Sequence, residues 1–261
     1  MSKLYAFVAD GMEEVECLAV VDIARRGGIQ VELISIMGRR EVTGSHNITV
    51  LADRLFEETV FQPGDVLFLP GGGKGVENLT AHGGLAALLK DAAARGVRLA
   101  VFPEFCLTGY TCGDLFLQRT LQQGALDGLQ TLLDASRELD VVALVGLPLL
   151  VRGKLYNCAA VLCGGRLLGL VPKTYLPNYG EFYEKRQFTP GSTEVETVTV
   201  CGQEVPFGTS LLFRCRQMPS FVLGVEICED LWSALPPSTF HALAGATVIA
   251  NLSASAWKVE G

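Results

Sequence analysis

Gly224-Val225-Glu226-Ile227-Cys228-Glu229-Asp230-Leu231-Trp232 is an apolar stretch that runs into a cysteine flanked by acidic residues. The pattern predicts a buried strand that presents a thiol at its end, where backbone N–H groups of the next turn can hold an oxyanion. Two other apolar runs also end in a charged residue: a carboxylate in Phe102-Pro103-Glu104 and an ammonium in Val171-Pro172-Lys173. A thiol, a carboxylate and an ammonium, all at strand ends, indicate a site that cleaves amides.

The composition is that of a well-buried globular protein. Of the 261 residues, 49% are hydrophobic and 19% are charged, and the mean hydropathy is +0.33. This length allows one large or two small domains. The net charge of −7, with no compensating basic cluster, argues against a nucleic-acid partner. A small anionic substrate stays compatible with it, because one local lysine can outweigh the global charge.

The cysteines and histidines do not form a recognisable metal site. No Cys-x-x-Cys pair occurs, and His46, His82 and His241 are scattered, so we expect them at the surface or at helix ends. We therefore expect no metal ion. For six of the eight cysteines we expect ordinary core packing, because cysteine is among the most buried residue types. These six are Cys17, Cys106, Cys158, Cys163, Cys201 and Cys215.

The sequence favours a protein of the cytoplasm. The N-terminus lacks the basic-then-apolar pattern of a signal peptide, and Val141–Val151 is too short and too interrupted by Gly and Pro to span a bilayer. We therefore expect no membrane partner. Free thiols in a chain without a leader are typical of a reducing compartment.

The first region alternates strands with helices. Glu13–Arg26 is predicted as a helix that stops at Gly27-Gly28, and a second helix with leucines and alanines at helical spacing ends at Arg95-Gly96. Short turns between such elements predict a parallel sheet flanked by helices. The predicted strands of this region are Leu4–Val8, Gln30–Ile36 and Asp65–Leu69.

The rest of the chain is richer in strands. A strand at Val97–Phe102 precedes a long helix predicted over Asp114–Leu139, with Leu117, Leu121, Leu129, Leu132 and Leu133 on one face. Cys163-Gly164-Gly165 separates two strands as in a hairpin. The strands predicted after the helix are Val141–Leu147, Tyr156–Leu162, Leu167–Val171, Ser210–Arg214, Phe221–Ile227 and Thr247–Leu252.

Two segments of the first region carry a family pattern. They are Phe7-Val8-Ala9-Asp10-Gly11-Met12-Glu13-Glu14-Val15-Glu16 and Leu69-Pro70-Gly71-Gly72-Gly73-Lys74-Gly75-Val76-Glu77-Asn78-Leu79. Over residues 1–96 the chain resembles the first half of a ThiJ/PfpI superfamily domain. In that superfamily the acid matching Glu16 hydrogen-bonds a reactive cysteine. Pro103 occupies the expected place of that cysteine, and Cys106 follows three residues later, so the resemblance implies a half-domain without its nucleophile.

The second region carries several motifs in order. They are Phe102-Pro103-Glu104-Phe105-Cys106-Leu107-Thr108-Gly109-Tyr110, then Pro172-Lys173-Thr174-Tyr175-Leu176-Pro177, then Glu181-Phe182-Tyr183-Glu184-Lys185-Arg186, then the Cys228 strand and Asn251-Leu252-Ser253-Ala254-Ser255. Residues 97–261 thereby resemble the glutaminase domain of bacterial glutamine-dependent NAD synthetases. This domain is a module of the nitrilase superfamily, the carbon–nitrogen hydrolases.

The two resemblances together imply an α/β chain of two partial domains. A parallel, flavodoxin-like βαβ half-domain (residues 1–96) is joined to an incomplete nitrilase-like α-β-β-α sandwich (residues 97–261). The nitrilase-type module normally opens with its own strand and helix. We expect the unit formed by Asp65–Leu69, the helix ending at Gly96 and Val97–Phe102 to take their place.

The second family normally continues past Ser255 into further strands and an ATP-dependent synthetase domain. The resemblance therefore implies no cofactor in this chain, because ATP and magnesium would belong to the synthetase domain, which would be a partner. It also implies weak turnover unless another chain supplies the absent parts. A natural fusion, an engineered one and an error of sequence assembly are all compatible with the join. Glutaminase domains of this family assemble through large interfaces, so a homo-oligomer is also compatible.

The second resemblance implies a mechanism and a set of site residues. Cys228 would attack the side-chain amide of glutamine, Glu104 would carry the protons, and Lys173 with the N–H of Glu229 would hold the oxyanion. Glu184 would orient Lys173. The residues that match positions lining the glutamine pocket are Tyr110, Tyr179, Glu229, Trp232 and Ser255.

Two other functions stay open. One is a ThiJ/PfpI-type stress or glyoxalase-like protein, which would need a cysteine of low pKa near Glu16, and Cys106 is the nearby candidate. The other is a catalytically inactive fusion product.

Overall fold

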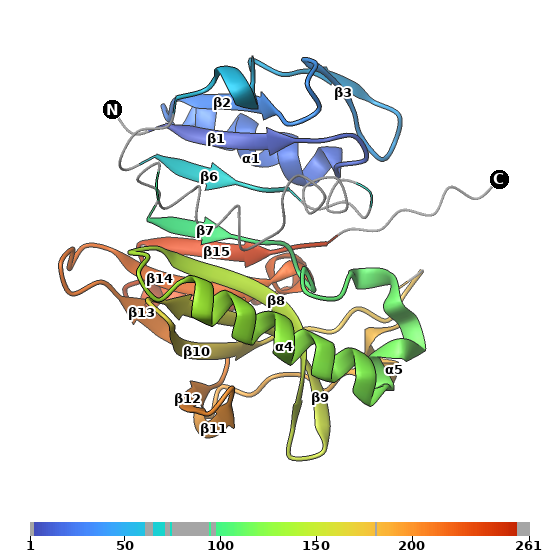
Figure 1. Ribbon diagram of the computed structural model, residues 1–261, viewed down its shortest axis with the longest axis vertical. Coiled ribbons are helices and arrows are strands. Elements are labelled where there is room, and N and C mark those ends of the chain that lie inside the picture. The colour runs from blue at the N-terminus through green and yellow to red at the C-terminus, as the bar shows by residue number, and fades with distance from the viewer. Residues whose placement is uncertain are drawn as a thin grey trace.

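The structure is a computed structural model that describes residues 3–60, 65–70, 74, 94, 98–180 and 182–254 (Figure 1). The strands of the first region are β1 (Leu4–Val8), β2 (Val31–Ser35), β3 (Glu41–Thr43), β4 (Thr49–Leu51), β5 (Arg54–Leu55) and β6 (Val66–Phe68). Those of the second are β7 (Leu99–Val101), β8 (Val142–Val151), β9 (Lys154–Cys163), β10 (Arg166–Pro172), β11 (Glu196–Val200), β12 (Gln203–Phe207), β13 (Leu212–Arg214), β14 (Val222–Ile227) and β15 (Val248–Leu252). The α-helices are α1 (Glu14–Arg26), α4 (Arg119–Ala135), α5 (Glu184–Gln187) and α6 (Pro237–Leu243), and the 3₁₀ helices are η1 (Phe56–Glu58), η2 (Tyr110–Leu117) and η3 (Cys228–Trp232).

One sheet passes through both regions of the chain. Within the described residues its order is β11-β12-β10-β9-β8-β7-β6-β1-β2-β5. Strand β6 of the first region lies parallel to β7 of the second, with Leu67 opposite Ala100, and β7 continues parallel to β8. The step from β6 to β7 can be followed at the middle of Figure 1. The predicted parallel pairing of these two strands is therefore present, while most of the helix predicted between them lies outside the described residues.

The first region packs apolar side chains on both faces of its strands. Ala6 and Val8 of β1 face α1, where they meet Cys17 and Val21. Tyr5 and Phe7 of the same strand contact a second cluster on the opposite face. Burial of both faces is typical of a parallel sheet, and it explains why the strand is a continuous apolar run.

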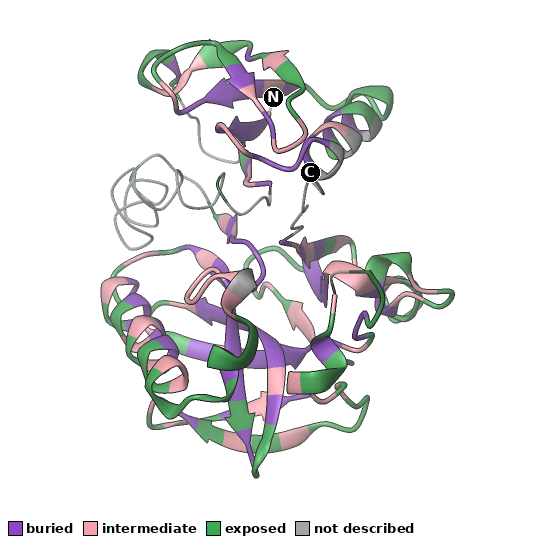
Figure 2. Ribbon diagram, turned by 90° about the vertical axis from the view of Figure 1, so that its right-hand side faces the viewer, coloured by how far each residue is buried: buried purple, intermediate pink, exposed green. Residues whose placement is uncertain are grey.

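The second region forms an α-β-β-α sandwich. Leu147 on β8 and Leu162 on β9 point toward α4, where they pack with Leu129. The alternate side chains, such as Leu144, point to the other face and pack against β14 and β15 of the second sheet, Val225 among them. Helix α6 lies on the far side of that second sheet and contacts β14. Figure 2 shows the buried strands between helices whose outer faces are exposed.

The long helix predicted over Asp114–Leu139 is divided in two. Gln118 has an extended backbone, so η2 ends before it and α4 begins after it. Phe116 of η2 is drawn into a cluster with Phe105 and Phe188, which is separate from the core under α4. Leu117 is consequently 54% exposed, and the prediction that it lies on the buried face was wrong.

The hairpin β11–β12 was not predicted, although the sequence carries a signal for it. Thr197, Val198, Thr199 and Val200 alternate polar with apolar residues, which is a strand pattern. A two-residue turn follows, and its residues, Cys201 and Gly202, both have a positive φ, as in a type I′ hairpin.

The cysteine predictions hold in part. Cys17 and Cys158 are fully buried, and Cys106 and Cys201 pack at the edge of the core. Cys163 and Cys215 are also partly exposed but belong to none of the apolar clusters of the described residues, so core packing was the wrong prediction for these two. All eight thiols are free of disulfide bonds. Among the described residues, no helix has the length and the apolar character that crossing a membrane would require.

Candidate active site

A buried ammonium lies where β10 ends. Lys173 follows Pro172, and its side chain is completely buried. Its Nζ donates to Glu104 Oε1 at 2.9 Å and to Glu184 Oε1 at 2.7 Å. Burial alone would lower the pKa of Lys173, but the charges of Glu104, Cys228 and Glu184 outweigh it and raise that pKa above its usual value. Lys173 therefore stays positively charged, held by two carboxylates.

Glu104 lies in the turn after β7. Its side chain is fully buried; besides Lys173, Oε1 accepts a hydrogen bond from Asn157 Nδ2 at 2.6 Å, and Oε2 accepts one from the N–H of Ala254 at 3.2 Å. Burial raises the pKa of Glu104 to about 7, although the neighbouring Lys173 partly offsets that effect. A carboxyl group with such a pKa exchanges protons readily at neutral pH.

Gly146 on β8 allows the turn that contains Glu104 to lie directly against this strand. A Cβ built on Gly146 would lie 2.3 Å from the backbone nitrogen of Phe105 and 2.7 Å from the carbonyl oxygen of Pro103. The turn therefore lies directly against the strand, where any larger residue would displace it. Phe105 itself has a φ of +51°, a conformation that is uncommon for a residue with a side chain.

Glu184 and Tyr110 complete the buried network. Glu184 is the first residue of α5, and its Oε1 accepts from the hydroxyl of Tyr110 at 2.6 Å as well as from Lys173. Burial, together with the charges of Glu104 and Glu184, raises the pKa of Tyr110 above its usual value, so the hydroxyl stays protonated and donates. Tyr110 was predicted to line a substrate pocket; the structure uses its hydroxyl to hold Glu184.

Cys228 begins η3 directly after β14, as the sequence predicted. It has a φ of +45°, which turns the chain sharply at the strand end. Its N–H donates to Asn251 Oδ1 at 3.1 Å. Its thiol is partly exposed, and its charge in the ionised form contributes to the raised pKa values of Lys173 and Tyr110. The sulfur therefore lies within electrostatic reach of the buried network.

Asp230, two residues after Cys228, was missed as a site residue. It is buried, and its carboxylate accepts hydrogen bonds from the backbone N–H groups of Thr174, Tyr175 and Ile227. Burial raises the pKa of Asp230 to about 7, against the effect of those amides. Its place beside Cys228 in the quoted stretch was the available signal. Asn157 and Asn251 were also missed as site residues: Asn251 opens the last of the quoted motifs, whereas nothing local in the sequence distinguishes Asn157.

A surface hollow of about 760 Å³ is lined by neighbours of the site residues in the chain, but its lining does not include Glu104, Lys173 or Cys228 themselves. Its lining includes Thr174, which follows Lys173, and Glu229, which follows Cys228. On its rim the hydroxyl of Tyr179 donates to Glu229 Oε2 at 2.7 Å, and that bond raises the pKa of Tyr179 to about 12. Tyr179 itself is 57% exposed.

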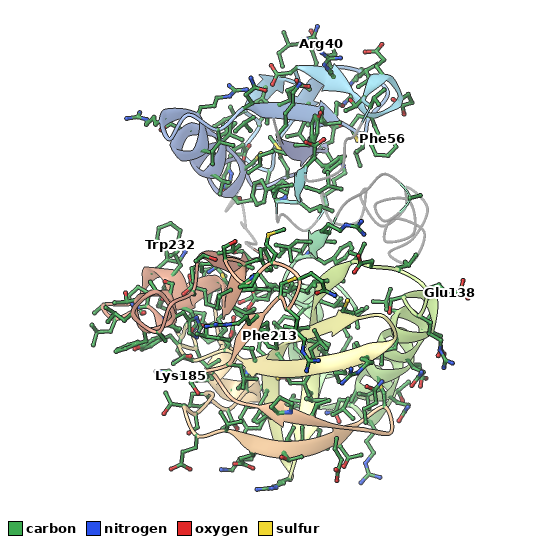
Figure 3. The ribbon with its side chains drawn as sticks, turned by 90° about the vertical axis from the view of Figure 1, so that its left-hand side faces the viewer. Arg40, Phe56, Glu138, Lys185, Phe213 and Trp232 are labelled. Atoms are coloured by element: carbon green, nitrogen blue, oxygen red, sulfur yellow. The ribbon has the colours of Figure 1, made fainter. Side chains whose placement is uncertain are left out.

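Two other predicted pocket residues lie elsewhere. Among the described residues, the lining of the hollow does not include Tyr110 or Trp232. Trp232 is 67% exposed, and Figure 3 shows its side chain on the outside of the ribbon. Ser255 lies outside the described residues, as does the side chain of Glu16.

The histidines differ from the sequence expectation. His241 is 3% exposed, and its Nε2 hydrogen-bonds the carbonyl oxygen of Thr209, so the surface position was the wrong prediction. Its place in the last turn of α6 agrees with the expected position at a helix end. His46 pairs with Glu14, Nδ1 to Oε2 at 2.6 Å. Glu13, Glu14 and His46 have potential metal-ligating atoms within 4.8 Å of one another, and Ser45 hydrogen-bonds to all three. His82 lies outside the described residues.

Comparisons with known proteins match two overlapping parts of the chain. The family model described as carbon–nitrogen hydrolase matches residues 54–261, and the DJ-1/PfpI family model matches residues 2–102. Glutamine-dependent NAD(+) synthetase of Mycobacterium tuberculosis is 51% identical over 160 residues, which cover 61% of this chain and 24% of that protein. The corresponding protein of Thermotoga maritima is 37% identical over 172 residues, 66% of this chain and 26% of the relative. The chain thus spans about a quarter of the length of these curated relatives.

A solved structure supports the same grouping. The crystal structure of a glutamine-dependent NAD(+) synthetase from Cytophaga hutchinsonii superposes with a TM-score of 0.57 and 29% sequence identity, over 76% of this chain and 30% of that chain. The first hundred residues carry the DJ-1/PfpI pattern, and the larger part, about four fifths of the sequence, carries the other. Because its strand-end thiol, its buried ammonium–carboxylate network and this match all lie in the larger part, the chain belongs to the carbon–nitrogen hydrolase family.

Proposed function

We propose that this chain hydrolyses the side-chain amide of glutamine and that the ammonia released serves NAD synthesis on a synthetase domain. The observation that carries the proposal is the buried network of Glu104, Lys173 and Glu184 within electrostatic reach of Cys228. The names of the relatives support the choice of glutamine and of NAD synthesis.

In the proposed reaction Cys228 is the nucleophile. Glu104 removes the thiol proton, and the sulfur attacks the amide carbon of glutamine. Lys173 stabilises first the thiolate and then the oxyanion, a contribution of about 3 kcal/mol for one well-placed donor. The leaving nitrogen takes the proton from Glu104 and departs as ammonia, which leaves a thioester on the sulfur.

A water molecule completes the cycle. Glu104 takes a proton from the water, whose oxygen attacks the thioester carbon. The C–S bond breaks, glutamate leaves, and Glu104 returns its proton to the sulfur, which restores the thiol. Glutamine and water are thereby converted to glutamate and ammonia, and side chains and water suffice for the step. ATP and Mg²⁺ belong to the proposed synthetase domain. The pKa of Glu104, about 7, supports its double role, because the group must both accept and return a proton.

The hollow lined by neighbours of the site residues supports a polar, zwitterionic substrate. Glu229 presents a carboxylate on its lining and is suited to an α-ammonium group. Asn178 and Lys185, also on the lining, offer partners for an α-carboxylate. We propose that glutamine enters with its amide toward Cys228 and its charged end toward these groups.

Ammonia release from glutamine by the purified chain tests the proposal. We expect turnover that Cys228→Ala reduces by more than about 10³-fold, as loss of a nucleophile does. Cys215→Ala is the matched control, because Cys215 is a partly exposed thiol of the second sheet, and it should leave the rate unchanged. Equal rates in the wild type and Cys228→Ala would end the assignment. If the wild type is inactive alone, turnover should appear when a synthetase domain is added.

The alternative of a ThiJ/PfpI-type enzyme has less support. It requires Cys106 as a reactive thiol, but burial raises the pKa of Cys106 to about 12. Its Sγ also hydrogen-bonds the carbonyl oxygen of Gly146. A thiol in this state is a poor nucleophile. The domain boundary near residue 96, the cytoplasmic location and a homo-oligomeric state stay predictions.

A further inference from the structure

One buried carboxylate holds the backbone of both strand ends at the site. Asp230 Oδ1 accepts from the N–H groups of Thr174 at 3.0 Å and Tyr175 at 2.7 Å, and Oδ2 accepts from Ile227 at 3.0 Å and, more weakly, from Thr174 at 3.3 Å. Thr174 directly follows Lys173, and Ile227 directly precedes Cys228. The carboxylate therefore connects the residue after the ammonium with the residue before the thiol.

This connection crosses from one sheet to the other. Lys173 continues β10, which belongs to the ten-stranded sheet, whereas Cys228 continues β14 of the three-stranded sheet. Their separation is therefore not set by the pairing of neighbouring strands. At this edge of the sandwich, hydrogen bonds to one side chain join the two ends directly.

We propose that Asp230 is a positioning residue that sets the distance between the thiol of Cys228 and the ammonium of Lys173. The catalytic role of Asp230 rests on the proposed function. The anchor, by which we mean the hydrogen bonds of Asp230 to Thr174, Tyr175 and Ile227, does not depend on the substrate. A displacement of about 1 Å at such a site can cost on the order of 100-fold in rate. Asp230 does not touch the reacting atoms, so its effect passes through Cys228 and Lys173.

The anchor needs a carboxylate rather than an amide. The N–H groups approach both oxygens: those of Thr174 and Tyr175 meet Oδ1, and that of Ile227 meets Oδ2. An asparagine would place its NH₂ group against one of these donors, whichever way the amide is turned. One of the two strand ends would then lose its acceptor. Because the carboxylate is 1% exposed, water cannot easily replace it.

The test compares Asp230→Asn with the wild type by the alkylation rate of Cys228. Iodoacetamide labelling at pH 8, where Asp230 is ionised, followed by peptide mass spectrometry, gives the rates of Cys228 and Cys215 in the same molecule. In the wild type we expect Cys228 to react faster, because Lys173 favours its thiolate. In Asp230→Asn we expect the Cys228 rate to fall about tenfold, the size of effect seen for residues that orient a site, while the Cys215 rate stays the same.

Steady-state kinetics with glutamine provide the second readout. We expect Asp230→Asn to lower kcat on the order of 100-fold with KM within about twofold, because alignment and not binding is disturbed. Asp230→Glu keeps the charge and should recover part of both readouts. The matched control is Asp134→Asn on α4, an exposed aspartate paired with Arg137, which should change neither.

Each possible result either supports or overturns the positioning role of Asp230. An unchanged alkylation rate of Cys228 in Asp230→Asn would overturn it, even if the melting temperature falls. If the wild type releases no ammonia either alone or with an added synthetase domain, the proposed function fails, and the alkylation ratio still decides the role of Asp230. If Asp230→Asn does not fold, hydrogen exchange of the wild type decides: the amides of Thr174, Tyr175 and Ile227 should exchange slowly and together, and rapid exchange at any of them contradicts the anchor.

Discussion

The side-chain amide of Asn251 hydrogen-bonds both the N–H and the carbonyl oxygen of Cys228. Its Oδ1 accepts the N–H of Cys228 at 3.1 Å, and its Nδ2 donates to the carbonyl oxygen of the same residue at 3.4 Å. Glu226, which lies opposite Asn251 in the β14–β15 pairing, accepts from the same Nδ2 and so orients the amide. The side chain of one strand thus holds the next strand's end in the left-handed conformation seen at Cys228.

Replacing Asn251 by alanine removes both hydrogen bonds to the backbone of Cys228. We expect Asn251→Ala to lose about 1–3 kcal/mol of unfolding free energy, because the partly buried N–H of Cys228 loses its acceptor. Turnover should fall at least tenfold as the thiol shifts. Urea unfolding and ammonia release measure the two effects. Gln123→Ala on the exposed face of α4 is the control and should change neither; full activity in Asn251→Ala would contradict this role of Asn251.

The backbone at Cys228 makes glycine a better replacement than alanine. With a φ of +45°, a side chain costs about 1 kcal/mol that glycine does not. We expect Cys228→Gly to be more stable than Cys228→Ala by about that amount, although glycine is usually the less stable choice. Chemical denaturation of the two inactive variants compares them directly. A more stable alanine variant would show that the turn is not strained.

Activity should rise with pH through neutrality. Glu104 has a pKa of about 7 and must be ionised to take the thiol proton, so its active form is scarce below that pH. We expect kcat/KM for glutamine to fall about tenfold per pH unit below an apparent pKa near 7. A pH–rate profile between pH 5 and 8 measures this. A profile that is flat over the range would remove Glu104 from the proton transfer.

The same carboxyl group should make stability depend on pH. Its pKa in the folded chain, about 7, lies above the ordinary value of 4.5, so folding favours its protonated form. Its stabilising contribution is complete below pH 4.5 and is lost as the pH rises toward 7. In Glu104→Gln this dependence is absent, so the stability of the wild type relative to the variant should decrease between pH 4.5 and 7. Urea midpoints at several pH values test the sign.

Replacement by alanine should lower stability at Gly146 and raise it at Gly124. Gly146 touches the backbone of the Glu104 turn, so a methyl group must displace that turn, at a cost of about 1–3 kcal/mol and most of the activity. Gly124 lies in α4 with open space around it, and Gly124→Ala should gain about 0.5–1 kcal/mol with no change in rate. Thermal unfolding and ammonia release of both variants check the pair. A neutral Gly146→Ala would mean that the turn has room.

The strand-end residues were predictable because their signal is local. An apolar run that stops at a charged residue marks the end of a buried strand, and this placed Cys228 after β14 and Lys173 after β10. The α-β-β-α arrangement came from recognised motifs in order, not from periodicity. The same local rule overlooked β11, although its Thr–Val alternation was equally clear.

The contacts of Asp230 and Asn157, which hold the site residues in place, were not predictable because their partners are distant in the sequence. Asp230 bonds amides 55 and 56 residues away, and Asn157 reaches Glu104 across 53 residues. Such contacts depend on sheet register and on how two sheets pack, which no short window of sequence contains. The division of the predicted helix at Gln118 has a similar cause, since the burial of Phe116 among distant aromatic rings decides it.

The parallel pairing of β6 with β7 lies in the stretch that two unlike family patterns have in common, because the two matches overlap over residues 54–102. Backbone amides and carbonyls are the same in every residue type, so a strand accepts any neighbour with a compatible direction and twist. The backbone pairing of two such strands therefore places few demands on side-chain identity, whereas the packing of Leu67 and Ala100 in their cores does depend on it. In a chain of this kind, the hydrogen-bonded ladder can continue without a break through strands that match two families.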